Sequence, residues 1–150
     1  MLDKKDIKLL ELLQADGRMT AKDAAEQVDM SIPATAERIK KLVETGHIHD
    51  FRAVVDPKKA GYDVTSFILV VMASSDYYEE FVSHAEESDE ILECHSITGE
   101  GSHILKVRLR DTSKLEGFLR KVQSWEGIVR THTMVVMTTF KEKTQLVVEE

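Results

Sequence analysis

The order of hydrophobic patterns between residues 64 and 140 constrains the fold more than any other feature of the sequence. Four segments are rich in β-branched and aromatic residues, which predicts strands. Apolar residues recur at helical spacing after Asp76 and after Asp111, so a helix is predicted within each strand pair. The predicted strands cover residues 64–73, 91–98, 104–109 and 128–139. This βαββαβ order is that of the ferredoxin-like unit and predicts an α+β fold.

The sheet of such a unit has helices on one face and leaves the other face open. In this sequence the open face carries apolar residues, and exposed apolar surface of that kind marks an interaction site. We therefore expect the open face to pack against a second copy of the chain, and we predict a homo-oligomer.

The first 46 residues predict three short helices instead of strands. Each apolar run follows a residue that can cap a helix, namely Asp3, Thr20 or Ser31. Pro33 falls in the first turn of the third helix, where its missing N–H is tolerated, and Gly46 ends that helix. The buried stripe of the third helix is predicted from its apolar residues, which are Ala36, Ile39, Leu42 and Val43.

The second and third helices, joined by a tight turn, have the arrangement of a helix-turn-helix. In that motif the later helix enters the major groove of double-stranded DNA. Arg38 suits a guanine edge or a phosphate, and the two lysines that follow suit phosphates. Ser31 offers its hydroxyl and the N–H groups of the helix N-terminus. The predicted DNA contacts are Ser31, Pro33, Ala34, Thr35, Arg38, Lys40 and Lys41.

Charge weighs against this interpretation. The chain has 20 Lys and Arg against 27 Asp and Glu, a net charge of −7, so affinity for DNA must come from a local basic patch. Glu37 and Glu44 further reduce the positive field of the third helix. The alternative is an ordinary three-helix packing unit whose basic residues form a solvated face.

The segment between the two halves is predicted to be a strand followed by a linker. Phe51, Val54 and Val55 favour a strand over residues 48–55, and Asp56-Pro57 breaks it. The predicted parts are a helix-turn-helix domain at 1–50, a strand and linker at 51–63, the sheet domain at 64–140 and a tail at 141–150.

The sequence gives no signal for a membrane span, a secreted protein or a metal site. No apolar run approaches the roughly 18 residues that a span needs, and the first residues lack a signal-peptide core, so we expect a cytoplasmic protein. The single cysteine, Cys94, cannot build a disulfide framework. His95, His103 and His132 match no zinc spacing, and we interpret them as structural.

Taken in order, these segments resemble the Lrp/AsnC (leucine-responsive, feast/famine) family of transcription regulators. The resemblance covers nearly the whole length and rests on the order and spacing of short motifs. In the N-terminal half they are Leu2-Asp3 with Asp6, Asp16-Gly17-Arg18, Ser31, residues 38–42, Gly46-His47-Ile48, Asp56-Pro57 and Gly61. In the C-terminal half they are Glu93-Cys94-His95, Thr98-Gly99, residues 105–107, Gly127-Ile128, Thr133 and residues 135–137.

The resemblance implies a winged helix-turn-helix domain followed by a RAM domain (regulation of amino acid metabolism) of ferredoxin-like fold. It implies dimers that assemble further, so that several weakly charged DNA-binding domains act together on one DNA. It also implies an amino-acid effector near the loop between the second and third strands of the RAM domain. The predicted effector-binding residues are Thr98, Gly99, Glu100, Gly101, Ser102 and Thr133.

This loop departs from the family pattern at one place. The family has an Asp followed by an aromatic residue shortly after the Thr-Gly pair, and here Ser102 and His103 stand there. A carboxylate pairs with the ammonium of an amino acid, whereas a hydroxyl gives a neutral hydrogen bond about half as strong. Either Glu100 supplies the charge, or the effector is not an ordinary amino acid, or the loop is a Gly-rich turn that serves oligomer contact.

Two alternative functions fit the sequence less well. Siroheme decarboxylases resemble this family in architecture, but their chemistry needs convergent basic groups, and Arg108, Arg110 and Arg130 do not fall clearly on one face. A stand-alone assembly module would not need the segment 31–46. We expect no catalytic residue, no metal and no cofactor other than an effector, and we interpret the chain as a sequence-specific DNA-binding regulator.

Overall fold

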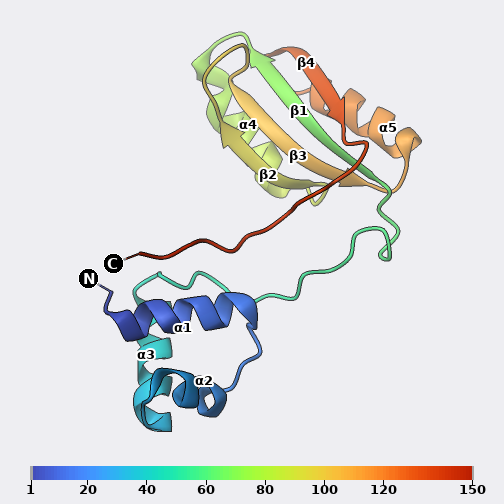
Figure 1. Cartoon of the computed structure of the whole chain (residues 1–150). Helices are drawn as coiled ribbons and strands as arrows, with labels where there is room; N and C mark the ends of the chain where they lie inside the picture. The colour runs from blue at the N-terminus through green and yellow to red at the C-terminus, as the bar shows by residue number, and fades with distance from the viewer. Residues whose placement is uncertain (1, 150) are drawn as a thin grey trace. The chain divides into compact units, whose positions relative to one another are not determined.

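The computed structural model describes residues 2–149 and divides them into two compact units (Figure 1). The first unit contains the chain up to Val54 together with the C-terminal tail from Lys141, and the second runs from Val55 to Phe140. Each unit has its own hydrophobic core, so each is described separately.

Three helices form the first unit, as predicted. Each begins at its predicted cap, because the side chains of Asp3, Thr20 and Ser31 accept hydrogen bonds from the backbone N–H three residues further on. At Asp3 the bond is reciprocal: the Asp6 carboxylate accepts from the Asp3 N–H at 3.1 Å, which completes a capping box. The helices are α1 (Lys4–Ala15), α2 (Ala21–Val28) and α3 (Ile32–Glu44).

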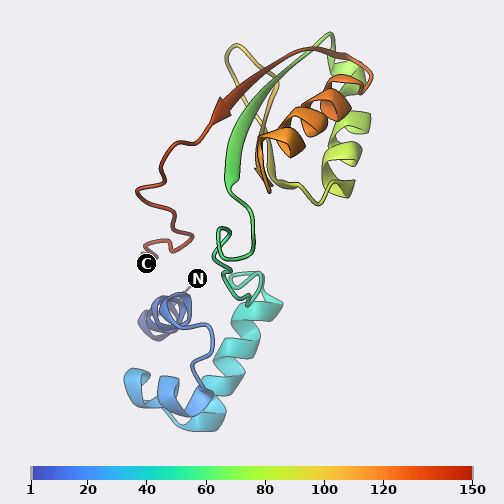
Figure 2. The same cartoon turned by 90° about the vertical axis from the view of Figure 1, so that its right-hand side faces the viewer.

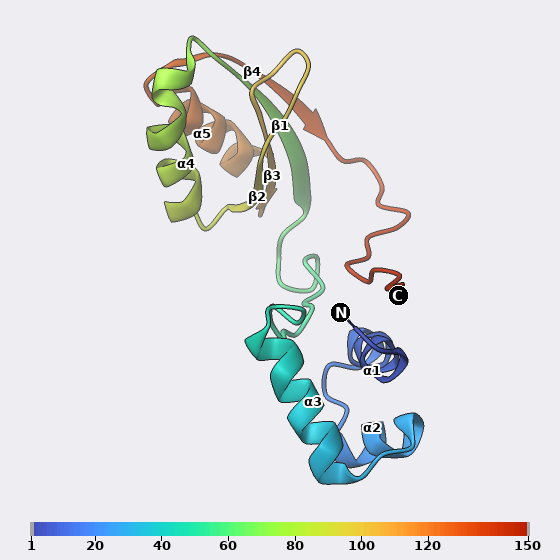
Figure 3. The ribbon, with the colours of Figure 1, turned by 90° about the vertical axis from the view of Figure 1, so that its left-hand side faces the viewer.

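The core of the first unit lies where the three helices meet. Leu9 of α1, Ala24 of α2 and Leu42 of α3 are buried in one cluster. The small side chain of Ala24 is fully buried and lets its helix approach α1 closely. Figure 3 shows α3 running beside both other helices of this unit.

The C-terminal tail folds back onto α1. The side-chain amide of Gln14 donates to the Leu146 carbonyl at 3.0 Å and accepts from the Leu146 N–H at 2.7 Å. The Gln145 side chain donates to the Gln14 carbonyl at 2.9 Å, and Val148 packs against the helical core. The tail is therefore part of the first unit, which no feature of the sequence indicated.

The strand predicted over residues 48–55 is absent, and this prediction is wrong. A strand needs a neighbouring strand to pair with its backbone groups, and the described part of the first unit contains none. The side chains that favoured a strand are exposed instead, Val54 by 89% and Val55 by 65%. Phe51 packs beside Gly17 at the end of α1.

The second unit is a four-stranded antiparallel sheet with the strand order β2-β3-β1-β4. Figures 2 and 3 show both long helices on one face of the sheet and leave the other face uncovered. This is the predicted ferredoxin-like βαββαβ arrangement. Its elements are β1 (Val64–Met72), η1 (Ser75–Tyr77), α4 (Tyr78–Glu87), β2 (Ile91–Ser96), β3 (His103–Leu109), α5 (Thr112–Gln123) and β4 (Ile128–Val135).

The start of α4 differs from the prediction. A short 3₁₀ helix, η1, precedes α4. Ser74 caps η1, and Asp76, the residue expected to cap the helix, lies inside η1. The Ser74 hydroxyl accepts from the Asp76 N–H at 3.1 Å and donates to the Asp76 carboxylate at 2.9 Å. At α5 the cap is Asp111, the first of three residues in sequence that could serve, and its carboxylate accepts from the Lys114 N–H at 2.8 Å.

Alternate residues of β1 point to opposite faces of the sheet. Ile68 and Val70 are fully buried and pack with Phe81 of α4 and Val122 of α5 in the core under the helices. The residues that alternate with them, such as Phe67 and Leu69, point to the uncovered face.

Candidate nucleic-acid interface and effector loop

Five of the seven predicted DNA contacts lie on accessible surface of the first unit. Ser31 caps α3 by accepting a hydrogen bond from the Ala34 N–H at 3.4 Å, and both residues are exposed. Pro33 is exposed in the first turn, and Lys40 and Lys41 are exposed two turns further along. The N-terminus of α3 and its basic pair are thus both open to a partner.

Thr35 is completely buried, so the prediction that it lies on the outward face of α3 is wrong. Its hydroxyl donates to the Ser31 carbonyl at 3.1 Å, which satisfies the polar group inside the core. The buried stripe is shifted accordingly: Thr35 and Leu42 are buried, whereas Ala36 and Val43 are exposed. The stripe was predicted from apolar residues alone and was therefore misplaced. A threonine whose hydroxyl bonds to its own helix packs like an apolar residue.

Arg38 is held by two carboxylates at the start of α1. Its Nη1 lies 2.7 Å from Asp3 Oδ2 and 2.7 Å from Asp6 Oδ1. Hydrogen bonds to Asp6 and Asp3 raise the pKa of Arg38. The pKa of Asp3 is lowered first by the Asp6 backbone N–H and then by the Arg38 side chain. In this arrangement the guanidinium links α3 to α1 and is engaged within the chain.

The partners of Arg38 were missed because Asp3 was interpreted only as a helix cap, and Asp6 was given no ion-pairing role. Each carboxylate serves both roles by using one oxygen for the cap and the other for the arginine. A usable signal was present, because Arg38 lies between the buried positions Thr35 and Leu42 on α3. A half-buried arginine needs an acidic partner on the element that it packs against.

Most of the net negative charge lies in the second unit. Residues 1–54 carry nine Lys and Arg against ten Asp and Glu, whereas residues 55–140 carry nine against fourteen. On α3, Lys40 lies 3.6 Å from Glu44, and Lys41 makes no ion pair with any residue that the structure describes. An exposed pair of this kind is worth only about 0.3–0.5 kcal/mol, so Lys40 can exchange Glu44 for a phosphate.

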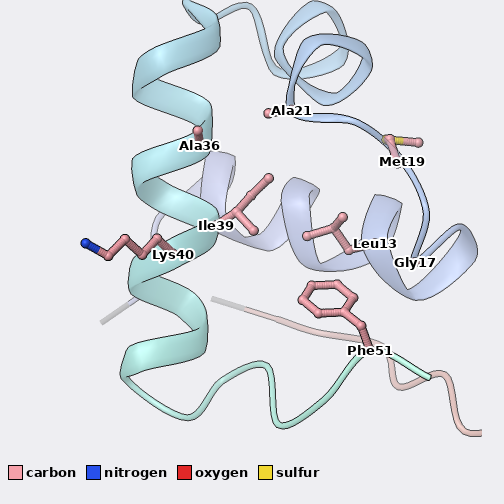
Figure 4. A pocket seen from close by; sticks show the side chains of 8 residues that line it. All are labelled: Leu13, Gly17, Met19, Ala21, Ala36, Ile39, Lys40 and Phe51. Atoms are coloured by element: carbon pink, nitrogen blue, oxygen red, sulfur yellow. The ribbon is translucent and has the colours of Figure 1, made fainter.

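A cleft of about 350 Å³ opens beside α3 in the first unit (Figure 4). Leu13, Ile39 and Phe51 point toward one another across it, and Lys40 points away. A ligand site combines an apolar lining with a few convergent polar groups, and this lining has no such convergence. The cleft is therefore the open edge of the helical core. Its lining residues are Leu13, Gly17, Met19, Ala21, Ala36, Ile39, Lys40 and Phe51.

Two glycines of the β2–β3 loop, residues 97–102, are required by its geometry. Gly99 has a φ of +112°, a conformation that side chains of L-residues rarely adopt. Gly101 is buried against β1, where a Cβ atom would lie 2.6 Å from Leu69 Cδ1 and 3.0 Å from the Val70 carbonyl oxygen. The close approach of this loop to β1 therefore depends on the missing side chain at Gly101.

Ser102, at the place of the family's Asp, is engaged within the second unit. Its hydroxyl donates to the Val70 carbonyl at 3.3 Å and accepts from His103 Nδ1 at 2.9 Å. The ring of His103 is 3% exposed and packs against Tyr78 and Phe81, with centroid distances of 4.7 and 4.8 Å. Burial lowers the pKa of His103, which favours the neutral ring. Because the Ser102 hydroxyl donates its one proton to Val70, Nδ1 of His103 is the donor in their contact. The hydroxyl therefore has no donor left for a ligand.

The other predicted effector residues separate into two places. Thr133 lies on β4 and pairs with Ile68, whereas the loop adjoins β1 at Val70, whose partner on β4 is Thr131. Within one chain β1 thus separates Thr133 from the loop, and Thr133 lies two residues along β4 from the position that is level with the loop. The exposed tip of the loop consists of Thr98, Gly99 and Glu100.

The titratable residues of β2 are Glu93, Cys94 and His95. The Glu93 carboxylate lies 3.1 Å from Lys106 and 3.3 Å from His95. Burial raises its pKa, but hydrogen bonds from Lys106 and His95 outweigh burial, and the net pKa is lowered. Burial and the nearby Glu86 raise the pKa of the Cys94 thiol, which keeps it protonated.

Neither a metal site nor a membrane-spanning helix is found in the described residues. No group of three or more His, Cys, Asp or Glu side chains lies close enough there to hold a metal ion. Over residues 2–149, none of the helices combines the length and apolar character that crossing a membrane requires.

Known proteins match both units. Residues 2–48 match the winged helix-turn-helix DNA-binding domain, and residues 65–146 match the Lrp/AsnC ligand binding domain. The chain is 36% identical to the HTH-type transcriptional regulator FL11 of Pyrococcus furiosus over 99% of this chain and 98% of that protein. It is 38% identical to the proline dehydrogenase transcriptional activator of Rhizobium radiobacter over 94% of this chain and 92% of that protein.

A solved structure shares the fold over nearly the whole length. It is a transcriptional regulator of Neisseria meningitidis in complex with L-Met, with a TM-score of 0.93 and 28% identity, and the match covers 97% of this chain and 96% of that one. The sequence and structural matches agree for both units. The chain therefore belongs to the Lrp/AsnC family, and it is a helix-turn-helix transcription regulator rather than an enzyme.

Proposed function

We propose that two copies of the chain place their α3 helices in successive major grooves of one DNA site. The observation that carries this proposal is the exposed surface of α3, where the Ser31-capped N-terminus, Lys40 and Lys41 are accessible. The lysines supply phosphate contacts, and the N–H groups of the helix N-terminus supply another. Because the first unit is nearly neutral, each copy binds modestly and several copies must act together.

In this proposal Arg38 positions α3 and does not read a base. Its guanidinium is 2.7 Å from both Asp3 and Asp6, and releasing it would leave two acidic groups close together without a cation. Contact with DNA therefore falls to the exposed side chains of the helix, Lys40 and Lys41 among them.

Retardation of DNA fragments by Lys40→Ala/Lys41→Ala tests the proposal. A phosphate contact from an exposed lysine is worth about 1 kcal/mol, and two bound copies lose four such contacts, so affinity is expected to fall roughly a thousandfold. The matched control is Lys58→Ala/Lys59→Ala, which removes the same charge from an exposed turn of the second unit. Equal loss of affinity in both double variants would contradict the assignment to α3.

We propose next that the uncovered face of the sheet pairs with the same face of a second copy. The register places Lys106 of β3 and Met134 of β4 on either side of Phe67, so their side chains share this face. Ile104 and His132 flank Leu69 in the same way. The apolar members of this face, Phe67, Leu69, Ile104 and Met134, can pack against the same side chains of a second copy about a two-fold axis.

Light scattering tests this pairing. Phe67→Lys would bury a charge in the paired face, and we expect the mass of the assembly to fall. The control Ser113→Lys adds the same charge on the exposed surface of α5 and should leave the mass unchanged. An unchanged mass for Phe67→Lys would rule this face out.

We propose finally that an amino acid or a related metabolite binds at the tip of the β2–β3 loop in the assembled protein. Glu100 is exposed there and can pair with an ammonium group, a role that Ser102 cannot fill. The L-Met complex of the Neisseria meningitidis regulator supports this class of effector. Binding would alter DNA occupancy by favouring one assembly over another.

Calorimetric titration of the assembled protein with the twenty amino acids tests this site. We expect Glu100→Gln to weaken the best binder about tenfold, the value of one charge-assisted contact. Glu116→Gln, on the exposed surface of α5, is the matched control. The proposal fails if no amino acid binds, or if both variants bind like the unmodified chain.

A further inference from the structure

We propose that Glu37 is the base-reading residue of α3 and that it selects cytosine at one position in each half of the DNA site. This inference rests on the proposed contact of α3 with DNA and adds the source of its sequence preference. It starts from the orientation of the helix, which the buried residues fix.

Glu37 lies at the centre of the outward face of α3. Successive residues of an α-helix are about 100° apart, so Glu37 is about 160° from the buried Thr35 and about 140° from the buried Leu42. Pro33 precedes it by one turn and Lys40 follows by one turn, and both are exposed on the same face. A helix that presents this face to a groove presents the Glu37 carboxylate to the base edges.

The neighbours of Glu37 leave its carboxylate unpaired in the described residues. Two lysines follow Glu37 on the helix at i+3 and i+4: Lys40 lies 3.6 Å from Glu44 instead, and Lys41 makes no ion pair with any described residue. Arg38, the next residue along, is bound to Asp3 and Asp6 on the other side of the helix. In the N-terminal half of α3 the outward face therefore offers one acceptor-only group, flanked by side chains that suit the DNA backbone. The other carboxylate on this face, Glu44, lies two turns further on and is paired with Lys40.

A carboxylate in the major groove discriminates among bases by what it excludes. An ionised carboxylate has no hydrogen to donate, so it cannot form a hydrogen bond with an acceptor on a base edge. Guanine shows only the acceptors N7 and O6 in the major groove, and thymine shows the acceptor O4, so both repel the carboxylate. Adenine shows its N6 donor beside the N7 acceptor, and only cytosine shows its N4 donor without an adjacent acceptor. Repulsion between the carboxylate and the acceptors of the other three bases weakens binding to sites that carry those bases. It therefore strengthens the preference for cytosine without raising the affinity for the cytosine site.

Selection of bound sequences from a random DNA pool tests the assignment, with the unmodified chain, Glu37→Ala and Glu37→Gln compared in parallel. For the unmodified chain we expect one cytosine in each half-site, preferred roughly five- to 150-fold over other bases. Glu37→Ala should lose the preference at that position alone and bind unrelated DNA more tightly. Glu37→Gln should favour adenine there, because an amide pairs with N6 and N7.

The matched control is Glu11→Gln, which removes the same charge from the exposed surface of α1 and should select the same sites as the unmodified chain. The inference is overturned if Glu37→Ala keeps every base preference of the unmodified chain. It is also overturned if the unmodified chain binds DNA with no base preference, or prefers a base other than cytosine at the position that Glu37→Ala alters. If the unmodified chain retains no DNA at all, the proposed role of α3 fails first.

Discussion

Helix α3 of the first unit and the β2–β3 loop of the second unit share one feature. In each, the polar residue that best fits a binding role is engaged within the chain, Arg38 with two carboxylates and Ser102 with Val70 and His103. In each, exposed neighbours such as Lys41 remain available to a partner. Residues that hold a binding element in place and residues that touch the ligand are therefore different sets in this protein.

The two regions are held by different forces. Arg38 is half-buried in ion pairs, which salt screens, whereas the loop is held by neutral hydrogen bonds and by the close approach of Gly101 to Leu69. We therefore expect α3 to respond to charge and ionic strength, and the loop to respond to added volume. The four predictions below test this contrast, from the largest expected effect to the smallest.

Gly101→Ala should destabilise the second unit by about 2 kcal/mol, because the new methyl group overlaps Leu69 and approaches the Val70 carbonyl. Denaturant unfolding measures the loss. The control is Gly117→Ala on α5, where a Cβ meets nothing within 4 Å and alanine favours the helix. Equal stability of the two variants would show that the loop has room for a side chain.

Arg38→Met should destabilise the first unit by about 1–2 kcal/mol, because Asp6 loses its charged hydrogen-bond partner. The difference from the unmodified chain should shrink at 1 M salt, which screens the ion pairs. Lys41→Met removes the same charge from an exposed position and is expected to stay within about 0.5 kcal/mol. If both variants unfold alike, Arg38 is not a structural link.

Ser102→Ala should cost about 1 kcal/mol, since it removes the bond to Val70 and leaves the buried Nδ1–H of His103 without an acceptor. In contrast to Arg38→Met, this loss should not depend on salt. Thermal unfolding at low and high ionic strength separates the two cases. A salt-dependent loss would contradict the neutral bonding assigned to the loop.

His103 should make the second unit less stable in acid. Burial lowers its pKa below the value of about 6.5 that it has when unfolded. Its contribution is therefore complete above about pH 6.5 and is lost as the pH falls through the folded pKa. The fall in unfolding temperature between pH 7.5 and pH 5 should be smaller in His103→Phe than in the exposed control His49→Gln. An unchanged fall would exclude His103 as its source.

The sequence predicted the elements better than the contacts between them. Helix caps such as Thr20 and the β-branched and aromatic composition of strands such as β1 are local signals, and both were confirmed. The strand at 48–55 was predicted from the same signals, but strand formation needs a partner that local sequence does not reveal. The engagement of Arg38 with Asp3, 35 residues apart, and of the tail with Gln14 are long-range contacts that follow from packing alone.

The dependence of DNA affinity on salt is the most direct test of the central claim, that the lysines of α3 and not Arg38 meet the phosphates. Each lost phosphate contact lowers the slope of log affinity against log salt by about 0.9. For two bound copies, Lys40→Ala/Lys41→Ala should therefore flatten the slope by roughly three to four. A slope equal to that of the unmodified chain, measured on the same fragment and the same assembly, would contradict the account.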